Sequence, residues 1–149
     1  MMATVFDAAK YILELCGEQD MLPITTWKLQ KLVYYSQAWS LVWDDEPLFD
    51  EEIQAWANGP VCPELYKAHR GRLKISVLDI EGDSQNLLPN QRDTIDVVFN
   101  HYGKKTAQYL SELTHQERPW KDARGTLLPG IRGTSVITLE NMAEYYGGL

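Results

Sequence analysis

Apolar residues recur most regularly between Thr25 and Trp43, and their spacing predicts a long helix. They fall three and four positions apart, which puts them on one broad face of a helix. That face holds Leu29, Leu32, Val33, Ser36, Trp39 and Trp43, with Ser36 as a small filler. The polar residues that lie largely off it are Lys28, Gln30 and Lys31. The length and apolar content of the segment predict the central helix of the fold.

Shorter helical patterns precede and follow this segment. A helix over 4–16 begins with Thr4 and Asp7, a capping-box spacing, and Gly17 is a natural stop. Asp50 can cap a short helix over 51–56, before a turn at 58–60. The remaining predicted helices cover 64–70, 90–102 (capped by Asn90 and stopped by Gly103), 104–116, 118–120 and 138–146. A short extended piece fits 75–80, and the glycine and proline residues of 126–133 predict a loop.

These patterns predict a mainly α fold. About seven helices, some very short, surround the long central helix, with at most a small β element. The chain of 149 residues suits one core. Long connections are few, so residues 1–149 are expected to form a single compact domain.

Charge is distributed unevenly along the chain. Residues 1–60 hold ten acidic and three basic residues, and the remainder is balanced, so the net charge of −7 comes from the first part. Phosphate contacts need a basic surface, so this pattern argues against direct DNA binding, whereas it permits a basic protein partner. Two cysteines, no apolar run of membrane length and no signal-like N-terminus predict a cytoplasmic protein without membrane contact.

Six acidic residues gather in the nine positions 44–52, namely Asp44, Asp45, Glu46, Asp50, Glu51 and Glu52. A solvated loop followed by a helix start explains them most simply. They can also form a docking surface for a cationic partner. A metal site fits less well, because the calcium-loop spacing and its glycine are missing, and no metal or other cofactor is predicted.

Five tryptophans raise the question of which are exposed. Trp39 and Trp43 share the apolar face and are expected in the core. Trp27 starts a helix beside polar residues, so it is the better candidate for an exposed anchor that binds a partner.

The sequence offers little for catalysis. It contains no GxSxG, GxGxxG, P-loop or HExxH pattern. Cys62 and His69 are seven residues apart, which on one helix is about 10 Å and too far for a thiolate–imidazole pair. Two basic clusters suit a solvated surface or, as an alternative, a nucleic-acid contact. They are Arg70, Arg72 and Lys74, and Arg118, Lys121 and Arg124 around Trp120.

Three segments of the chain carry a family motif. The central segment KLQKLVYYSQAW contributes Leu29, Leu32, Tyr35 and Trp39. The second segment contributes Pro47, Leu48, Phe49, Glu52, Ile53, Ala55, Trp56, Gly59, Pro60, Val61 and Tyr66. The late element is Pro119 and Trp120. Together these residues resemble the SocA-like antitoxin family, also called the Panacea domain, which includes phage-associated GepA proteins. These are mostly turn and core types, so we interpret the motif as mainly structural.

The resemblance implies a bacterial or prophage antitoxin that binds and neutralises a cognate protein toxin. It also implies an alternative, since at least one type of member delivers its toxin to the ClpXP protease. Some relatives carry an N-terminal helix-turn-helix region, which we do not expect here. On the residues alone, candidate contacts are Trp27 with Asp44, Asp45, Glu46, Asp50 and Glu51. A hydrolase using Cys62 or His69 is the competing hypothesis from a different class, although non-enzymatic binding is favoured.

Overall fold

The segment with the strongest apolar periodicity forms the longest helix, α2 (Thr26–Trp43), with Thr25 as its N-cap. The computed structural model describes residues 3–149. The other helices are α1 (Val5–Glu18), α3 (Pro63–His69), α4 (Pro89–Tyr102), α5 (Ala107–His115), α6 (Arg118–Arg124) and α7 (Leu139–Gly147). Two 3-10 turns are η1 (Val77–Asp79) and η2 (Ser84–Asn86). The mainly α prediction, with its helices around one long helix, is confirmed.

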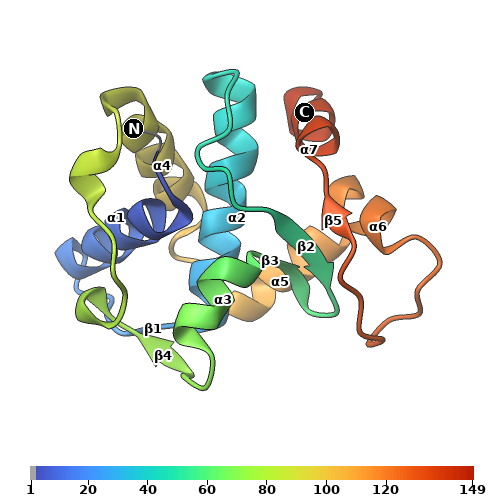
Figure 1. The fold of residues 1–149 in the computed structure, drawn as a ribbon, viewed down its shortest axis with the longest axis horizontal. Coiled ribbons are helices and arrows are strands. Elements are labelled where there is room, and N and C mark those ends of the chain that lie inside the picture. The colour runs from blue at the N-terminus through green and yellow to red at the C-terminus, as the bar shows by residue number, and fades with distance from the viewer. Residues whose placement is uncertain (1–2) are drawn as a thin grey trace.

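Helix α2 runs through the middle of the molecule, between α1 and α4 on one side and α6 and α7 on the other (Figure 1). It contacts α1, α4, α5 and α7. Because helices surround it, α2 is buried on nearly every side, including at Gln30, Lys31 and Gln37. The prediction that Gln30 and Lys31 lie off the buried face was therefore wrong.

The far end of α2 is more exposed than its sequence suggested. Trp43 has 48% of its surface exposed, and Trp39 is only partly buried. Their rings stack with centroids 4.8 Å apart. The prediction that both tryptophans lie in the core was wrong for Trp43, because this last turn of α2 is less enclosed than the rest of the helix.

Five short strands complete the fold over residues 3–149. They are β1 (Ile24–Thr25), β2 (Ile53–Trp56), β3 (Gly59–Val61), β4 (Lys74–Ile75) and β5 (Val136–Ile137). All pairings are antiparallel, β1 with β4, and β2 with both β3 and β5. These two small sheets agree with the expected minor β content.

Strand β2 replaces the helix predicted over 51–56. Its side chains alternate, with Ile53 and Ala55 buried and the two between and after them half-buried. Alternation with a period of two is a strand pattern. Trp56 pairs with Gly59 across a two-residue loop, and Gly59 has φ +121°, which favours glycine. Asp50 therefore caps no helix.

Two glutamines of α2 hold the segment that leads into and out of this hairpin. The Gln37 side-chain oxygen accepts the backbone N–H groups of Leu48 (2.7 Å) and Phe49 (3.3 Å), and its amide donates to the Phe49 carbonyl (2.9 Å). The Gln30 oxygen accepts the N–H of Cys62 at 2.9 Å, and its amide donates to the Cys62 carbonyl at 3.3 Å. Backbone groups outside helices and sheets need such partners when they are buried.

Several predicted boundaries shift slightly. Thr4 and Asp7 form the expected capping box, but α1 continues through Gly17 to Glu18. Helix α4 is capped at Leu88 rather than Asn90 and ends before Gly103 as expected. Within the described residues, no helix combines the length and apolar content needed to cross a membrane.

Replacing Gln37 with leucine is expected to destabilise the fold strongly. The change introduces an apolar side chain of similar size and leaves two buried N–H groups and one carbonyl without their partner. The free energy of unfolding should fall by about 3 kcal/mol or more, measured by urea unfolding. The exposed Gln108→Leu change should cost less than about 0.5 kcal/mol. Equal losses in the two variants would contradict this role for Gln37.

Candidate functional site

Two cavities open at the N-terminal end of α2, and Trp27 and Asn58 line both. We call them together the Trp27 cleft. The first has a volume of about 380 Å³ and is lined by Trp27, Lys31, Asn58, Ala107, Gln108, Ser111 and Glu112. The second, of about 450 Å³, is lined by Trp27, Trp56, Ala57, Asn58, Tyr66, Arg70, Gly130, Arg132, Gly133 and Thr134. Helices α2 and α5, the β2–β3 loop and the loop before β5 thus meet at one hollow.

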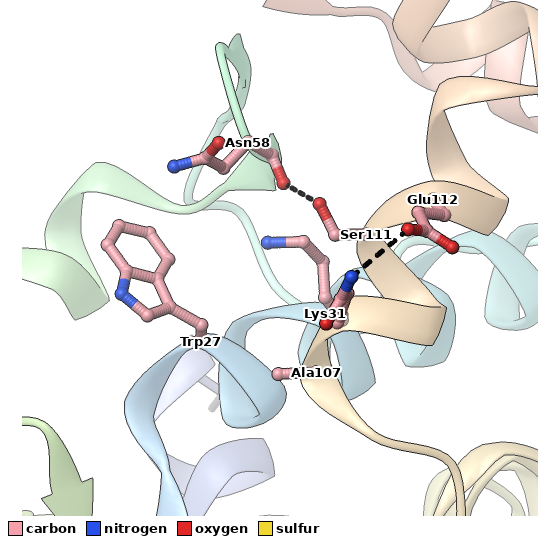
Figure 2. Close-up of a pocket in the computed structure, with 7 residues that line it drawn as sticks. Trp27, Lys31, Asn58, Ala107, Ser111 and Glu112 are labelled. Atoms are coloured by element: carbon pink, nitrogen blue, oxygen red, sulfur yellow. Dashed lines mark hydrogen bonds between the residues drawn. The ribbon is translucent and has the colours of Figure 1, made fainter.

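Lys31 is the most unusual residue of the cleft. It lies one helical turn after Trp27, and its amine points into the space between the Trp27 ring, Asn58 and Ser111 (Figure 2). The residue is only 1% exposed, and its amine has no hydrogen-bond partner among the residues that the structure describes. The amine lies over the Trp27 ring, 5.5 Å from its centroid. A cation–π contact of this kind offsets only part of the cost of removing a charge from water.

Gly59 makes room for the lysine. A Cβ atom at this position would lie 2.6 Å from Lys31 Cε and 3.0 Å from the Thr114 hydroxyl oxygen. Such distances are far inside van der Waals contact. Glycine at position 59 therefore permits both the positive φ of the hairpin and the close approach of Lys31.

The polar groups near Lys31 are bonded to other partners. The Ser111 hydroxyl donates to the Asn58 carbonyl, and the Gln108 amide donates to the Glu112 carboxylate at 3.3 Å (Figure 2). Burial without a counter-ion lowers the pKa of Lys31 to about 7. Burial also lowers the pKa of His69 and His115, and the nearby Lys31 charge lowers both further.

Aromatic side chains build one wall of the cleft. The Trp27 and Tyr66 ring centroids are 6.3 Å apart, and those of Trp56 and Tyr66 are 4.9 Å apart. Behind them, the Trp120 indole donates to the Trp56 carbonyl at 2.8 Å, and its ring stacks on His115 at 4.0 Å. The tryptophan of the late motif thus supports the tryptophan of the hairpin.

Arg124, of the second basic cluster, has a structural role. The buried Arg124 guanidinium donates to the carbonyls of Leu128 (3.1 Å) and Ile131 (2.7 Å). It lies over the Trp120 ring, 5.4 Å from the centroid. Arg124 therefore fixes the loop that contributes residues 130–134 to the cleft, while Arg118 and Lys121 are exposed. Of the first cluster, Arg70 lines the cleft and Arg72 pairs with Asp79 at 3.3 Å.

The acidic candidates lie away from the Trp27 cleft. Asp44 caps the C-terminal end of α2, whose eighteen residues span about 27 Å. Asp50 and Glu51 line another cavity beside Gln37, in the middle of the helix, which is ten residues or about 15 Å from Trp27. The structure therefore does not bring Trp27 and these acids together in one cavity. Three of the acids accept hydrogen bonds within the chain, Asp44 from the Thr94 hydroxyl at 2.7 Å, Glu51 from the Val5 N–H at 3.1 Å and Glu52 from the Gln54 amide at 2.7 Å. The exposed ones are Asp45, Glu46, Asp50 and Glu52.

Cys62 and His69 are both held by Gln30 rather than paired with each other. The Gln30 amide donates to the His69 ring at 2.9 Å as well as to the Cys62 carbonyl. Burial raises the pKa of the Cys62 thiol to about 11, which keeps it protonated at neutral pH. This environment is the reverse of one that activates a cysteine nucleophile. Within residues 3–149, no three histidine, cysteine or acidic side chains are grouped as a metal site would require.

Lys31 was missed as a candidate from the sequence, where it was assigned to the polar side of the helix. Its burial follows from α5 and the hairpin closing over α2, which no local pattern encodes. The only available signal was its i, i+4 spacing from Trp27, a candidate in its own right.

The comparison with known families fits this description. The sequence model of the family described as "Antitoxin SocA-like, Panacea domain" matches residues 29–121. The chain belongs to this family. No curated protein and no solved structure matches the chain. The Panacea match contains Lys31, Asn58 and the α5 side of the cleft, whereas Trp27 and Arg132 fall just outside it.

Most residues of the Panacea motif are buried, in agreement with a structural interpretation of the motif. The buried ones are Leu29, Leu32, Tyr35, Leu48, Phe49, Ile53, Ala55, Gly59, Pro60, Val61 and Pro119. Trp39, Pro47, Trp56, Tyr66 and Trp120 are half-buried. Three of these partly exposed aromatics, Trp56, Tyr66 and Trp120, form or support the cleft.

Lys31→Met is expected to stabilise the protein at pH 7, because methionine fills similar space without a charge. The advantage should depend on pH. Between pH 8 and 10 the folded lysine, with a pKa of about 7, is neutral, while the unfolded lysine still binds a proton. Raising the pH therefore favours the folded wild type by up to about 1.4 kcal/mol per pH unit.

The measurement is urea unfolding of both proteins at pH 8, 9 and 10. The stability advantage of Lys31→Met should shrink by about 2–3 kcal/mol over that range. His69 and His115 stay neutral throughout it, so they do not contribute. Lys104→Met, at an exposed position, should show a difference from wild type that does not change with pH. A constant advantage for Lys31→Met would contradict the neutral buried amine.

Proposed function

We propose that this Panacea protein is an antitoxin that binds a cognate protein toxin in the cytoplasm and neutralises it. The observation that carries the proposal is the family match over residues 29–121. Membership of an antitoxin-like family favours a protein partner, and the site must then be a surface able to bind one.

The Trp27 cleft has the composition of such a surface. Tryptophan, tyrosine and arginine are the residues most enriched at energetic centres of protein interfaces. The cleft presents Trp27, Trp56 and Tyr66 together with Arg70 and Arg132. Its aromatic rings are half-buried and pre-positioned, which lowers the entropy cost of binding.

The acidic segment is a second proposed contact, suited to a basic region of the toxin. Asp45, Glu46 and Asp50 are exposed there, with Asp44 and Glu51 at its inner edge. Exposed charges of one sign steer a partner of opposite charge and raise its association rate. We therefore expect this segment to affect the association rate more than the dissociation rate.

Co-expression with the product of the adjacent gene tests the proposal. We expect rescue of growth from that product and co-purification of the two proteins. Trp27→Ala should weaken the complex by about tenfold or more, as for an interface anchor. The absence of both rescue and complex would overturn the antitoxin proposal.

Charge reversal of Asp45, Glu46 and Asp50 to lysine should slow association without preventing folding. The matched control reverses three other exposed acids, Glu18, Glu64 and Glu144. Stopped-flow association at two salt concentrations compares the sets, since screening removes a steering effect. Equal rates in the two sets would exclude the acidic segment as a contact.

The same cells distinguish sequestration from delivery to the ClpXP protease. Sequestration leaves the amount of toxin unchanged whether or not the protease is present. Delivery lowers the amount of toxin only in cells that contain the protease. We propose sequestration as the primary mode, because the cleft is a binding surface formed by this chain without help from a second protein.

A further inference from the structure

Two side-chain atoms stand out among residues 3–149, because they are buried without any hydrogen-bond partner. They are Lys31 Nζ and His115 Nε2. Both belong to the region of the Trp27 cleft, since Lys31 lines the first cavity and His115 stacks behind Trp56 on Trp120. Buried polar groups in folded proteins are almost always satisfied, so an unsatisfied amine beside a cavity indicates a missing partner.

An anion is the partner that this amine lacks. A buried ammonium is unfavourable alone and becomes favourable when an oxygen anion bonds to it. Glu112 lines the same cavity, but its carboxylate accepts from Gln108 on the outer side of α5 (Figure 2). The Glu112 carboxylate therefore does not act as the partner of the Lys31 amine.

The surroundings favour a single carboxylate over phosphate or nucleic acid. The cavity offers one point charge, and phosphate groups are usually bound by several donors, with arginine or backbone N–H groups among them. Among the residues that line the first cavity, Lys31 is the one cation and Glu112 places a negative charge at the wall. A phosphate dianion there would face the Glu112 charge with one cation to neutralise it, whereas one carboxylate on a peptide is neutralised by Lys31. Arg70 and Arg132 line the second cavity.

The second cavity has room for the residues that flank the carboxylate in the bound ligand. It has the larger volume, about 450 Å³, and combines aromatic faces with the guanidinium groups of Arg70 and Arg132. The two cavities share Trp27 and Asn58 and therefore adjoin each other, so one peptide can reach both. At their junction the Asn58 side chain is exposed and the Trp27 ring is half-buried.

We propose that the Trp27 cleft binds an acidic peptide segment of the partner protein, with one carboxylate placed against the Lys31 amine and the flanking residues against Trp27, Trp56 and Tyr66. The chemistry of the ligand rests on the cleft itself. Its assignment to a toxin rests on the proposed function.

Selection of linear peptides from a random phage-displayed library on the purified protein tests the proposal. The selected peptides should share an aspartate or glutamate at one position. Replacing that acid by its amide should reduce affinity about tenfold or more, the effect of losing a charged hydrogen bond. Peptides without a shared acid, or no selected peptides at all, would overturn the proposal.

Three variants assign the carboxylate to its place. Lys31→Met should lose about tenfold or more in affinity for the selected peptide, and Lys104→Met, outside both cavities, should lose none. Glu112→Gln changes an exposed residue and should raise affinity about two- to fivefold by removing a like charge. Unchanged affinity in both Lys31→Met and Glu112→Gln would place the peptide elsewhere and contradict the proposal.

Competition separates the ligand classes. Three competitors are compared for their ability to displace the bound peptide: inorganic phosphate, a short single-stranded oligonucleotide and the same acidic peptide in free form. If phosphate or the oligonucleotide displaced it at a lower concentration than the free acidic peptide, the carboxylate assignment would be overturned.

Failure of this proposal can be told apart from failure of the antitoxin proposal. Rescue that persists in Lys31→Met and Trp27→Ala would leave the antitoxin function intact and refute only this cleft as the binding site.

Discussion

The arrangement of this molecule depends on two buried glutamines of the central helix. Gln30 and Gln37 lie two helical turns apart, and each satisfies the backbone of a segment that has no regular partner of its own. Without these amides, the chain at Leu48, Phe49 and Cys62 would bury unpaired polar groups against α2. Because both ends of the segment are fixed, the hairpin between them projects from α2 at a defined place.

The cleft follows from that constraint. The hairpin tip brings Asn58 and Gly59 over Lys31, and the glycine lets the lysine stem pass beneath the strand. Helix α5 closes the other side, with the Ser111 hydroxyl bonded to the Asn58 carbonyl. The Lys31 amine is thereby removed from water with no partner, an unfavourable arrangement that stability alone does not explain. Binding sites commonly retain such groups, because a ligand satisfies them.

Further along α2, buried polar groups have hydrogen-bond partners within the fold. Tyr35 and Tyr146 both donate to the carboxylate of Glu117, at 2.7 and 2.8 Å. Burial raises the pKa of Glu117, and the two hydroxyl donors oppose that shift. This group is satisfied within the fold, and it joins α2 to α7 and to the start of α6. The contrast with Lys31 shows that the same helix serves as a structural hub along one part and as the floor of a cleft at its beginning.

Local sequence determined the elements whose signals lie within one segment. The bounds of α2, the capping box of Thr4 and Asp7 and the helix predicted over 64–70 depend on neighbouring residues only, and the structure has them nearly as expected. Family membership could also be recognised from the sequence, because the motif residues are read directly from the chain. Helical periodicity found the apolar residues of α2 for the same reason.

Tertiary structure decided which polar residues are buried and where strands form. Apolar spacing marks one face of a helix, but Lys31 is buried by α5 and the hairpin, which lie far along the chain. Strand β2 needs β3 and the distant β5 for its hydrogen bonds, so four residues alone did not reveal it. The cleft exists only where these distant segments meet, and its unpaired amine is a property of their packing.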